Sequence, residues 1–233
     1  MTEQSKTYNI TPIHMGKSNA YLVSNPDLVF LIDTGSSKNI HNLEQALKQN
    51  NLQITDIDYI IVTHAHYDHV GHLAEIKEKS GAKVLSHRDE VVYLRKGYTL
   101  FPEGTMLPFK ILSKAGNKLF SRSGRFTPVE PDIIIEEEYD LSKPELSVSI
   151  IHTPGHTSGS ICVIINNESA IVGDTLFNLI PGTVYPPFAN DEEDLIKSWE
   201  KLLSTGCSIF YPGHGKPFSL EKFRKCFEKR KSN

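Results

Sequence analysis

The pattern of apolar and polar residues predicts a chain that opens with strands and then alternates strands with helices. Apolar runs bounded by turn residues predict strands at residues 8–13, 19–24, 28–32, 59–63 and 82–86. Apolar residues at helical spacing predict helices over residues 37–47, 68–81 and 89–96, with Ser37 as the N-cap of the first. The first third is thus expected to be a strand meander that passes into β-α-β units.

The same order of elements returns after Pro131. The pattern there predicts strands at residues 133–136, 148–152, 161–166, 170–173 and 208–211. Helices are expected over residues 194–203 and 220–231. Each half of the chain therefore runs from strands into β-α units.

Residues 93–130 do not continue this alternation of strands and helices, because they contain several Gly and Pro and their apolar residues follow no steady period. Only residues 108–119 have a pattern that fits a helix. Seven Lys or Arg stand against Glu103 and Glu130, a net charge of +5, and since the whole chain carries -3 the remainder carries -8. We expect residues 1–233 to form a single domain in which this basic segment is a lid over the substrate. A partner surface, or a solvated excursion with its own small core, is the alternative.

Composition excludes several classes of protein. With 39% apolar and 23% charged residues, the chain has the composition of an ordinary globular domain. No apolar run approaches the roughly 20 residues that span a bilayer, and the polar start lacks the apolar core of a signal peptide. Cys162, Cys207 and Cys226 are expected to be free thiols of a cytoplasmic protein. With a net charge of -3, we expect a small-molecule substrate rather than nucleic acid or a membrane, and a homodimer is left open.

A metal site is indicated by residues 63–69, which contain the pattern H-x-H-x-D-H directly after an apolar run. His64 and His66 are alternate residues of an extended segment and therefore point the same way. Asp68 and His69 follow where an amphipathic helix begins. Imidazole and carboxylate are ligands of zinc, so four ligating side chains converge on a space with room for two ions.

Three further segments share one sequence pattern, in which an apolar strand leads into a Gly-rich turn that carries a ligand-type residue. These residues are His156, Asp174 and His214. Glycine lets such a turn bring a side chain to a crowded centre. Each segment alone is a weak signal, but the three together with the first motif are specific.

With these four motifs in order over nearly its whole length, the chain resembles the metallo-β-lactamase superfamily. The resemblance implies an α/β (α+β) fold, a four-layer αββα sandwich of two mixed β-sheets flanked by helices. It assigns ligands to two metal ions: His64, His66 and His156 to the first, Asp68, His69 and His214 to the second, and Asp174 to both. Asp33, in an Asp-Thr-Gly turn, would support the site without binding a metal.

Residues 153–159 and 173–177 are most similar to the glyoxalase II and lactonase branch of this superfamily. Class B β-lactamases of the main subclass have Cys at the position of Asp174, which argues against β-lactam hydrolysis. The lactonases of this pattern have Tyr at the position of Phe177. Because the chain ends soon after His214, we expect it to lack the helical domain with which glyoxalase II holds glutathione.

The resemblance and the ligand set predict a metallo-hydrolase. We expect two zinc ions, with iron or manganese as alternatives, and a hydroxide between them that attacks a carbonyl. Asp68 is the expected catalytic residue, taking the proton and returning it to the leaving group. The substrate would be an ester, thioester or lactone, and the basic segment favours an anionic one. An iron-dependent oxidoreductase or dioxygenase and a non-catalytic metal-binding module are the alternatives.

Overall fold

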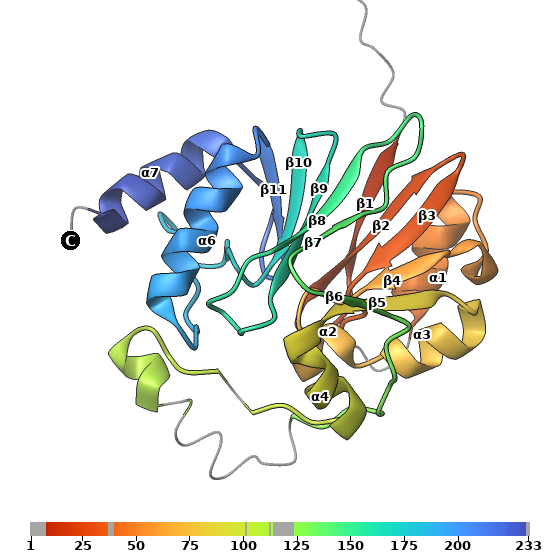
Figure 1. The fold of residues 1–233 in the computed structure, drawn as a ribbon, viewed down its shortest axis with the longest axis horizontal. Coiled ribbons are helices and arrows are strands. Elements are labelled where there is room, and N and C mark those ends of the chain that lie inside the picture. The colour runs from red at the N-terminus through yellow and green to blue at the C-terminus, as the bar shows by residue number, and fades with distance from the viewer. Residues whose placement is uncertain (1–7, 37–39, 101, 112, 114–123, 232–233) are drawn as a thin grey trace, which may run out of the picture.

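The computed structural model describes residues 8–36, 40–100, 102–111, 113 and 124–231 (Figure 1). Ser37 and most of the C-terminal part of the predicted helix over residues 108–119 therefore lie outside the described residues. Residues 107–111 are helical, as that pattern predicts.

Twelve strands form two mixed sheets of six. The first sheet has the order β1 (Asn9–His14), β2 (Asn19–Asn25), β3 (Leu28–Ile32), β4 (Tyr59–Ile61), β5 (Lys83–His87) and β6 (Ile133–Ile135). Its first three strands are antiparallel, and β3 to β6 are parallel. The second sheet has the order β12 (Phe218–Ser219), β11 (Ile209–Pro212), β10 (Ser169–Gly173), β9 (Ile161–Ile165), β8 (Val148–His152) and β7 (Glu138–Asp140). Only β10 and β11 are parallel in it.

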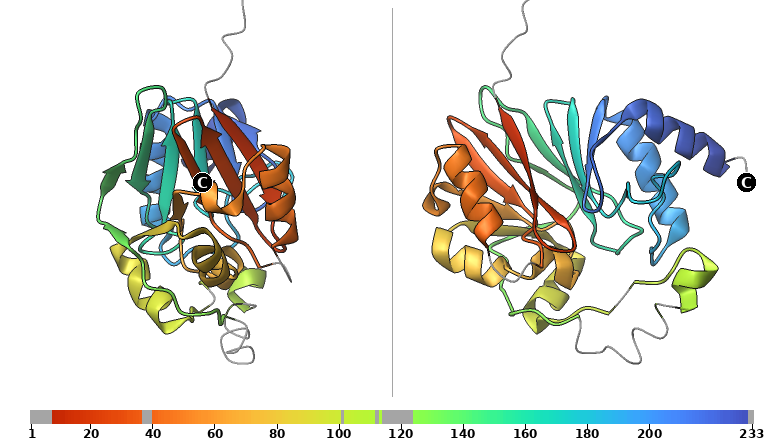
Figure 2. Two further views of the ribbon diagram at one scale, coloured as in Figure 1. Left: turned by 90° about the vertical axis from the view of Figure 1, so that its right-hand side faces the viewer. Right: turned by 180° about the vertical axis from the view of Figure 1, so that it is seen from behind.

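Helices cover the outer faces of both sheets (Figures 1 and 2). The first sheet is covered by α1 (His41–Gln49) and α3 (Leu73–Ser80), and the second by α6 (Glu192–Ser204) and α7 (Leu220–Lys231). A 3-10 turn, η1 (Ile54–Asp56), and two helices near the strand ends, α2 (Tyr67–Val70) and α4 (Arg88–Lys96), complete the described elements that have bounds. The predicted four-layer αββα sandwich is confirmed.

Three apolar clusters hold the layers together. The central cluster joins the inner faces of the two sheets and includes Phe30, Ile61 and Val163. A second cluster packs α1 and α3 on the first sheet, and a third packs α6 and α7 on the second around Trp199. Burying each such side chain stabilises the fold by about 1.5–3 kcal/mol relative to leaving it in water. The strand ends that carry the candidate ligands are therefore fixed on a well-packed frame.

The helix predicted over residues 68–81 is in fact two helices, α2 and α3. Gly71 separates them, and a Cβ on it would lie 2.6 Å from the carbonyl oxygen of Gly35. The amide of Gly71 donates to the carbonyl oxygen of Gly35 at 2.8 Å, so the chain is held against residue 35 at the point where α2 ends. The short edge strands β7 and β12 were not predicted, because Glu-Tyr-Asp and Phe-Ser contain no run of apolar residues.

The described helices include none that is long and apolar enough to cross a membrane.

Candidate metal centre

The first four candidate ligands come from the segment that follows β4. His64 and His66 lie in the extended stretch before α2, and Asp68 and His69 lie in α2. The three histidines are buried, whereas Asp68 is partly exposed. An extended stretch followed by one helical turn thus brings four side chains of a six-residue motif to one place.

The other three candidates come from the second half, each from the end of a different strand. His156 follows β8, Asp174 follows β10 and His214 follows β11. Gly173, just before Asp174, has φ +48, and a Cβ on it would lie 2.7 Å from Thr63 Oγ1. Only glycine fits there, because the backbone turns sharply against the first half.

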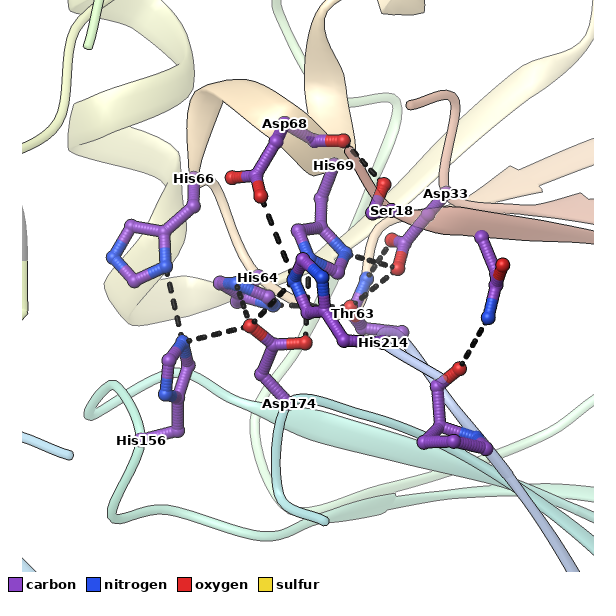
Figure 3. A network of polar contacts seen from close by, with 12 residues as sticks. Ser18, Asp33, Thr63, His64, His66, Asp68, His69, His156, Asp174 and His214 are labelled. Carbon is purple, nitrogen blue, oxygen red and sulfur yellow. Dashed lines mark hydrogen bonds and ion pairs between the residues drawn. The ribbon is translucent and has the colours of Figure 1, made fainter. Parts of the chain in front are cut away.

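All seven side chains converge between the two sheets (Figure 3). Their ligand-type atoms form two groups, each with its atoms within 4.8 Å of one another: His64, His66, His156 and Asp174, and then Asp68, His69 and His214. These are the two sets that the resemblance implies, with Asp174 in the first. Their roles as metal ligands stay a prediction.

The carboxylate of Asp174 lies between the two groups. It is 3.8 Å from His64 Nε2 and 3.4 Å from His156 Nε2 in the first group. It is 3.3 Å from His69 Nε2 and 3.4 Å from His214 Nε2 in the second. One carboxylate that reaches four imidazole nitrogens has the geometry of a bridge.

Hydrogen bonds from behind orient three of the imidazoles. The hydroxyl of Thr63 donates to Asp33 Oδ2 at 2.7 Å, so it accepts from His64 Nδ1 at 3.1 Å. Asp33 Oδ2 also accepts from His69 Nδ1 at 2.7 Å. The carbonyl oxygen of Phe188 accepts from His156 Nδ1 at 2.9 Å. In each case Nε2 is turned toward the centre, which is how proteins orient a histidine that binds a metal.

Burial and neighbouring charges set the protonation of the cluster. Burial lowers the pKa of His64 and His66 well below the ordinary value, and it also lowers the pKa of His156. Burial alone would lower the pKa of His69 as well, but Asp174 and Asp33 raise it well above that value. Burial opposes the charge of Asp174, yet His214 and His69 outweigh it and hold the pKa of its carboxyl well below the usual range. The first group thus offers neutral imidazoles beside an ionised carboxylate.

The donor set fits a bound cation. Among the described residues, four buried polar side-chain atoms have no hydrogen-bond partner, Asn25 Nδ2, Thr99 Oγ1, His64 Nε2 and Asp174 Oδ1, and the last two lie in the centre. Buried polar atoms are rarely left unpaired, and both of these belong to the predicted ligands. A Cβ on Gly213 would lie 2.4 Å from Asp174 Oδ1 and 2.6 Å from His69 Cε1, so the backbone approaches the centre as closely as a glycine allows.

Sequence reasoning missed Glu90, a buried carboxylate of α4 that connects the two halves. Its Oε2 accepts from the amide of Ala65, between His64 and His66, at 2.8 Å. Its Oε1 accepts from the hydroxyl of Thr157, next to His156, at 2.7 Å. Burial raises the pKa of Glu90, and these hydrogen bonds act against that shift. The available signal in the sequence was that Glu90 stands four positions before Leu94, on the apolar face of the predicted helix.

A cavity of about 310 Å³ opens onto the centre. Its floor is formed by five of the predicted ligands, His66, Asp68, His156, Asp174 and His214. Tyr67 also lines it. His72, His87 and His152 belong to neither group of ligand-type atoms, and the rings of His87 and His152 stack on each other at 4.0 Å between centroids.

The described part of the segment at 93–130 borders this cavity. Thr99, Leu100, Pro102, Phe109 and Gly124 line it. Lys110 is exposed and does not line it, and Lys114 and Lys118 lie outside the described residues. That the segment acts as a lid remains a prediction.

Known proteins resemble this chain in sequence and in fold. A probable metallo-hydrolase of Methanocaldococcus jannaschii is 31% identical over 201 residues, which cover 85% of this chain and 87% of the relative. A hydroxyacylglutathione hydrolase of Pelagibacter ubique is 31% identical over 130 residues, which cover 55% of this chain and 40% of the relative. The crystal structure of the B3 metallo-β-lactamase BLEG-1 superposes with a TM-score of 0.71 at 22% identity, over 92% of this chain and 95% of that one, and shows the same fold.

Residues 15–214 match the sequence model of one protein family, the metallo-β-lactamase superfamily. This range contains all seven candidate ligands, from both halves of the chain. The chain belongs to the metallo-β-lactamase superfamily.

Proposed function

We propose that the protein is a hydrolase that holds two metal ions with His64, His66, Asp68, His69, His156, Asp174 and His214. It would cleave an ester, thioester or lactone bond of a small molecule. The observation that carries the proposal is the position of Asp174, whose carboxylate lies within 3.3–3.8 Å of histidines of both groups. Seven ligand-type side chains exceed what one tetrahedral ion uses. Zinc is the proposed metal, with iron or manganese as alternatives, since all three accept imidazole and carboxylate.

The two carboxylates of the floor are proposed to have different roles in catalysis. When bound, such ions acidify a water molecule and polarise the substrate carbonyl. Among the described residues that line the cavity, Asp68 and Asp174 are the carboxylates. Asp174 is surrounded by four imidazole nitrogens, whereas Asp68 is partly exposed to the cavity and 3.5 Å from His214 Nε2. Asp68 is therefore the group to accept the proton of the attacking water and pass it to the leaving oxygen or sulfur.

The names of two relatives support hydrolysis, and one of them supports hydrolysis of an acyl bond. One is named a probable metallo-hydrolase, and another a hydroxyacylglutathione hydrolase. The second name describes hydrolysis of a thioester, which needs the same attack on a carbonyl as hydrolysis of an ester or a lactone. A small-molecule substrate, without nucleic acid or membrane, is part of the proposal.

Metal analysis combined with a substrate panel tests the proposal. The purified protein is expected to contain about two ions per chain and to hydrolyse at least one of a set of thioesters, esters and lactones. A chelator should abolish turnover, and added zinc should restore it. His64→Ala should lose metal and activity, whereas His41→Ala, on the exposed surface of α1, should keep both.

Two results would contradict it. If zinc-saturated protein hydrolyses no compound of the panel, the proposed hydrolase activity is contradicted. Protein that carries only iron and turns over a redox substrate would establish the oxidoreductase in its place.

A further inference from the structure

The cavity changes character between its floor and its walls. The floor carries imidazoles and carboxylates, whereas the walls above it carry large apolar side chains. We call six of these side chains the apolar wall: Leu100, Pro102, Phe109, Phe177, Ile180 and Phe188. From this gradient we infer that the substrate of the proposed hydrolase carries an apolar acyl chain, bound along the wall with its reacting carbonyl at the floor. The inference rests on the proposed function.

The apolar wall is continuous with the metal centre. The ring of Phe177 stacks on the ring of His214 at 4.7 Å between centroids and 16° between planes. The backbone carbonyl of Phe188 orients His156. An acyl group whose carbonyl lies at the floor would therefore meet apolar surface from its first methylenes outward.

Contacts between two distant segments hold the wall in place. Phe109 packs edge-on against Phe188 at 5.3 Å between ring centroids. The amide and the hydroxyl of Thr105 donate to the carbonyls of Pro187 and Pro186 at 2.9 and 2.8 Å. The wall thus exists before the substrate arrives, which lowers the entropy cost of binding.

Two large apolar side chains of the cavity lining are exposed to solvent. Leu100 is 56% exposed and Leu179, which also lines the cavity, is 61% exposed. They lie on segments far apart in sequence and flank the same opening. Grouped exposed apolar residues mark binding surfaces. A chain that extends from the floor to this opening would cover both leucines.

Charge at the cavity does not favour an anionic acyl group. None of the described residues that line the cavity is Lys or Arg. The expectation of an anionic substrate came from the basic segment, of which Arg95, Lys96, Lys110 and Arg125 are described, and none of these four lines the cavity. A second carboxylate at the far end of the substrate would be desolvated against the apolar wall, which is unfavourable because none of the described lining residues is Lys or Arg.

Acyl-chain length is the variable to test, with the zinc-loaded full-length protein. The probes are acetyl, butanoyl, hexanoyl and octanoyl thioesters of one small thiol, with the hexanedioyl thioester as the anionic match to hexanoyl. We expect kcat/KM to rise about fourfold per methylene from acetyl to hexanoyl, the factor that corresponds to burial of one methylene. The hexanedioyl thioester should be at least about tenfold poorer than hexanoyl.

A matched pair of variants tests whether the dependence of kcat/KM on acyl-chain length comes from the apolar wall. Ile180→Thr removes apolar surface from the cavity and should flatten the dependence on chain length. Ile134→Thr removes the same surface from a similarly exposed isoleucine on β6, away from the cavity, and should leave the slope unchanged. Equal slopes in the two variants, no dependence on length, or a preference for hexanedioyl would overturn the inference.

A binding measurement separates this inference from the proposed function. Octanoate and acetate are titrated into the zinc-loaded protein by calorimetry, without any turnover. Tighter binding of octanoate, lost in Ile180→Thr and kept in Ile134→Thr, supports the apolar wall even if no thioester is hydrolysed. Equal affinities overturn it even if thioesters are hydrolysed.

Discussion

In the metal centre beneath the cavity the candidate ligands His64, His69 and His156 are buried and their Nδ1 atoms are hydrogen-bonded, whereas in the cavity wall Leu100 and Leu179 are more than half exposed. The floor is built from strand ends joined by buried polar contacts, and the opening is built from loops. A buried polar network tolerates little change, because each partner removed leaves another unsatisfied. Exposed apolar loops can vary at little cost to the fold. We therefore expect changes at the floor to alter metal binding, and changes at the opening to alter the choice of substrate.

The largest effect is expected from Asp174→Asn, which removes the charge that lies between the two groups of ligands. The amide is nearly the same size, so the fold should survive. Loss of an outer hydrogen-bond partner of a ligand costs about 10- to 100-fold in metal affinity or activity, and the loss of a bridging ligand should cost more. Metal content after dialysis and kcat/KM on the preferred substrate measure it. A variant with full metal content and rate would exclude Asp174 from the centre.

Gly213→Ala should come next, because it adds only a methyl group but adds it inside the floor. That methyl would lie within 2.6 Å of both Asp174 and His69 and must displace one of them. We expect a loss of metal affinity of about tenfold or more with little change in melting temperature. Gly81→Ala is the control, since a Cβ there has open space and costs only backbone strain. Metal affinity that falls equally in both variants would contradict this.

Glu90→Gln tests whether the two halves of the floor are held in register by one carboxylate. The amide nitrogen cannot accept a hydrogen bond, so one of the donors from Ala65 and Thr157 loses its partner. The free energy of unfolding should fall by about 1–3 kcal/mol, and metal affinity by up to about tenfold. Urea denaturation of the metal-free and zinc-loaded protein measures both. Glu75→Gln on α3, a partly exposed carboxylate paired with Lys79 away from the centre, serves as the control, and an equal loss in that variant would argue against a positioning role.

The smallest effect is expected at the opening, from Lys110→Glu. Lys110 is exposed and does not line the cavity, so at physiological ionic strength its charge is largely screened from the substrate. The value of kcat/KM for the hexanedioyl thioester should change by about twofold or less. A drop of tenfold or more, relieved by salt, would instead restore the basic lid and the anionic substrate predicted from the sequence.

The sequence by itself determined most of the frame and named the ligand-type residues. Continuous apolar runs such as residues 28–32 and 161–165 predict strands buried on both faces, which is what β3 and β9 are. The motif at residues 63–69 is readable because its spacing is local, one extended stretch and one helical turn. The Gly-rich turns at His156, Asp174 and His214 became specific only as a set, in an order that matches the superfamily.

Only the tertiary structure decided what surrounds these residues. Glu90 contacts Thr157 across 67 positions, and the partner of His156 is a backbone carbonyl, which leaves no mark in a sequence. The break between α2 and α3 depends on Gly71 meeting the backbone of Gly35. The apolar wall joins Phe109 to Phe188 from segments without a steady period. Contacts between distant segments depend on how the two sheets pack, and local patterns carry no information about that packing.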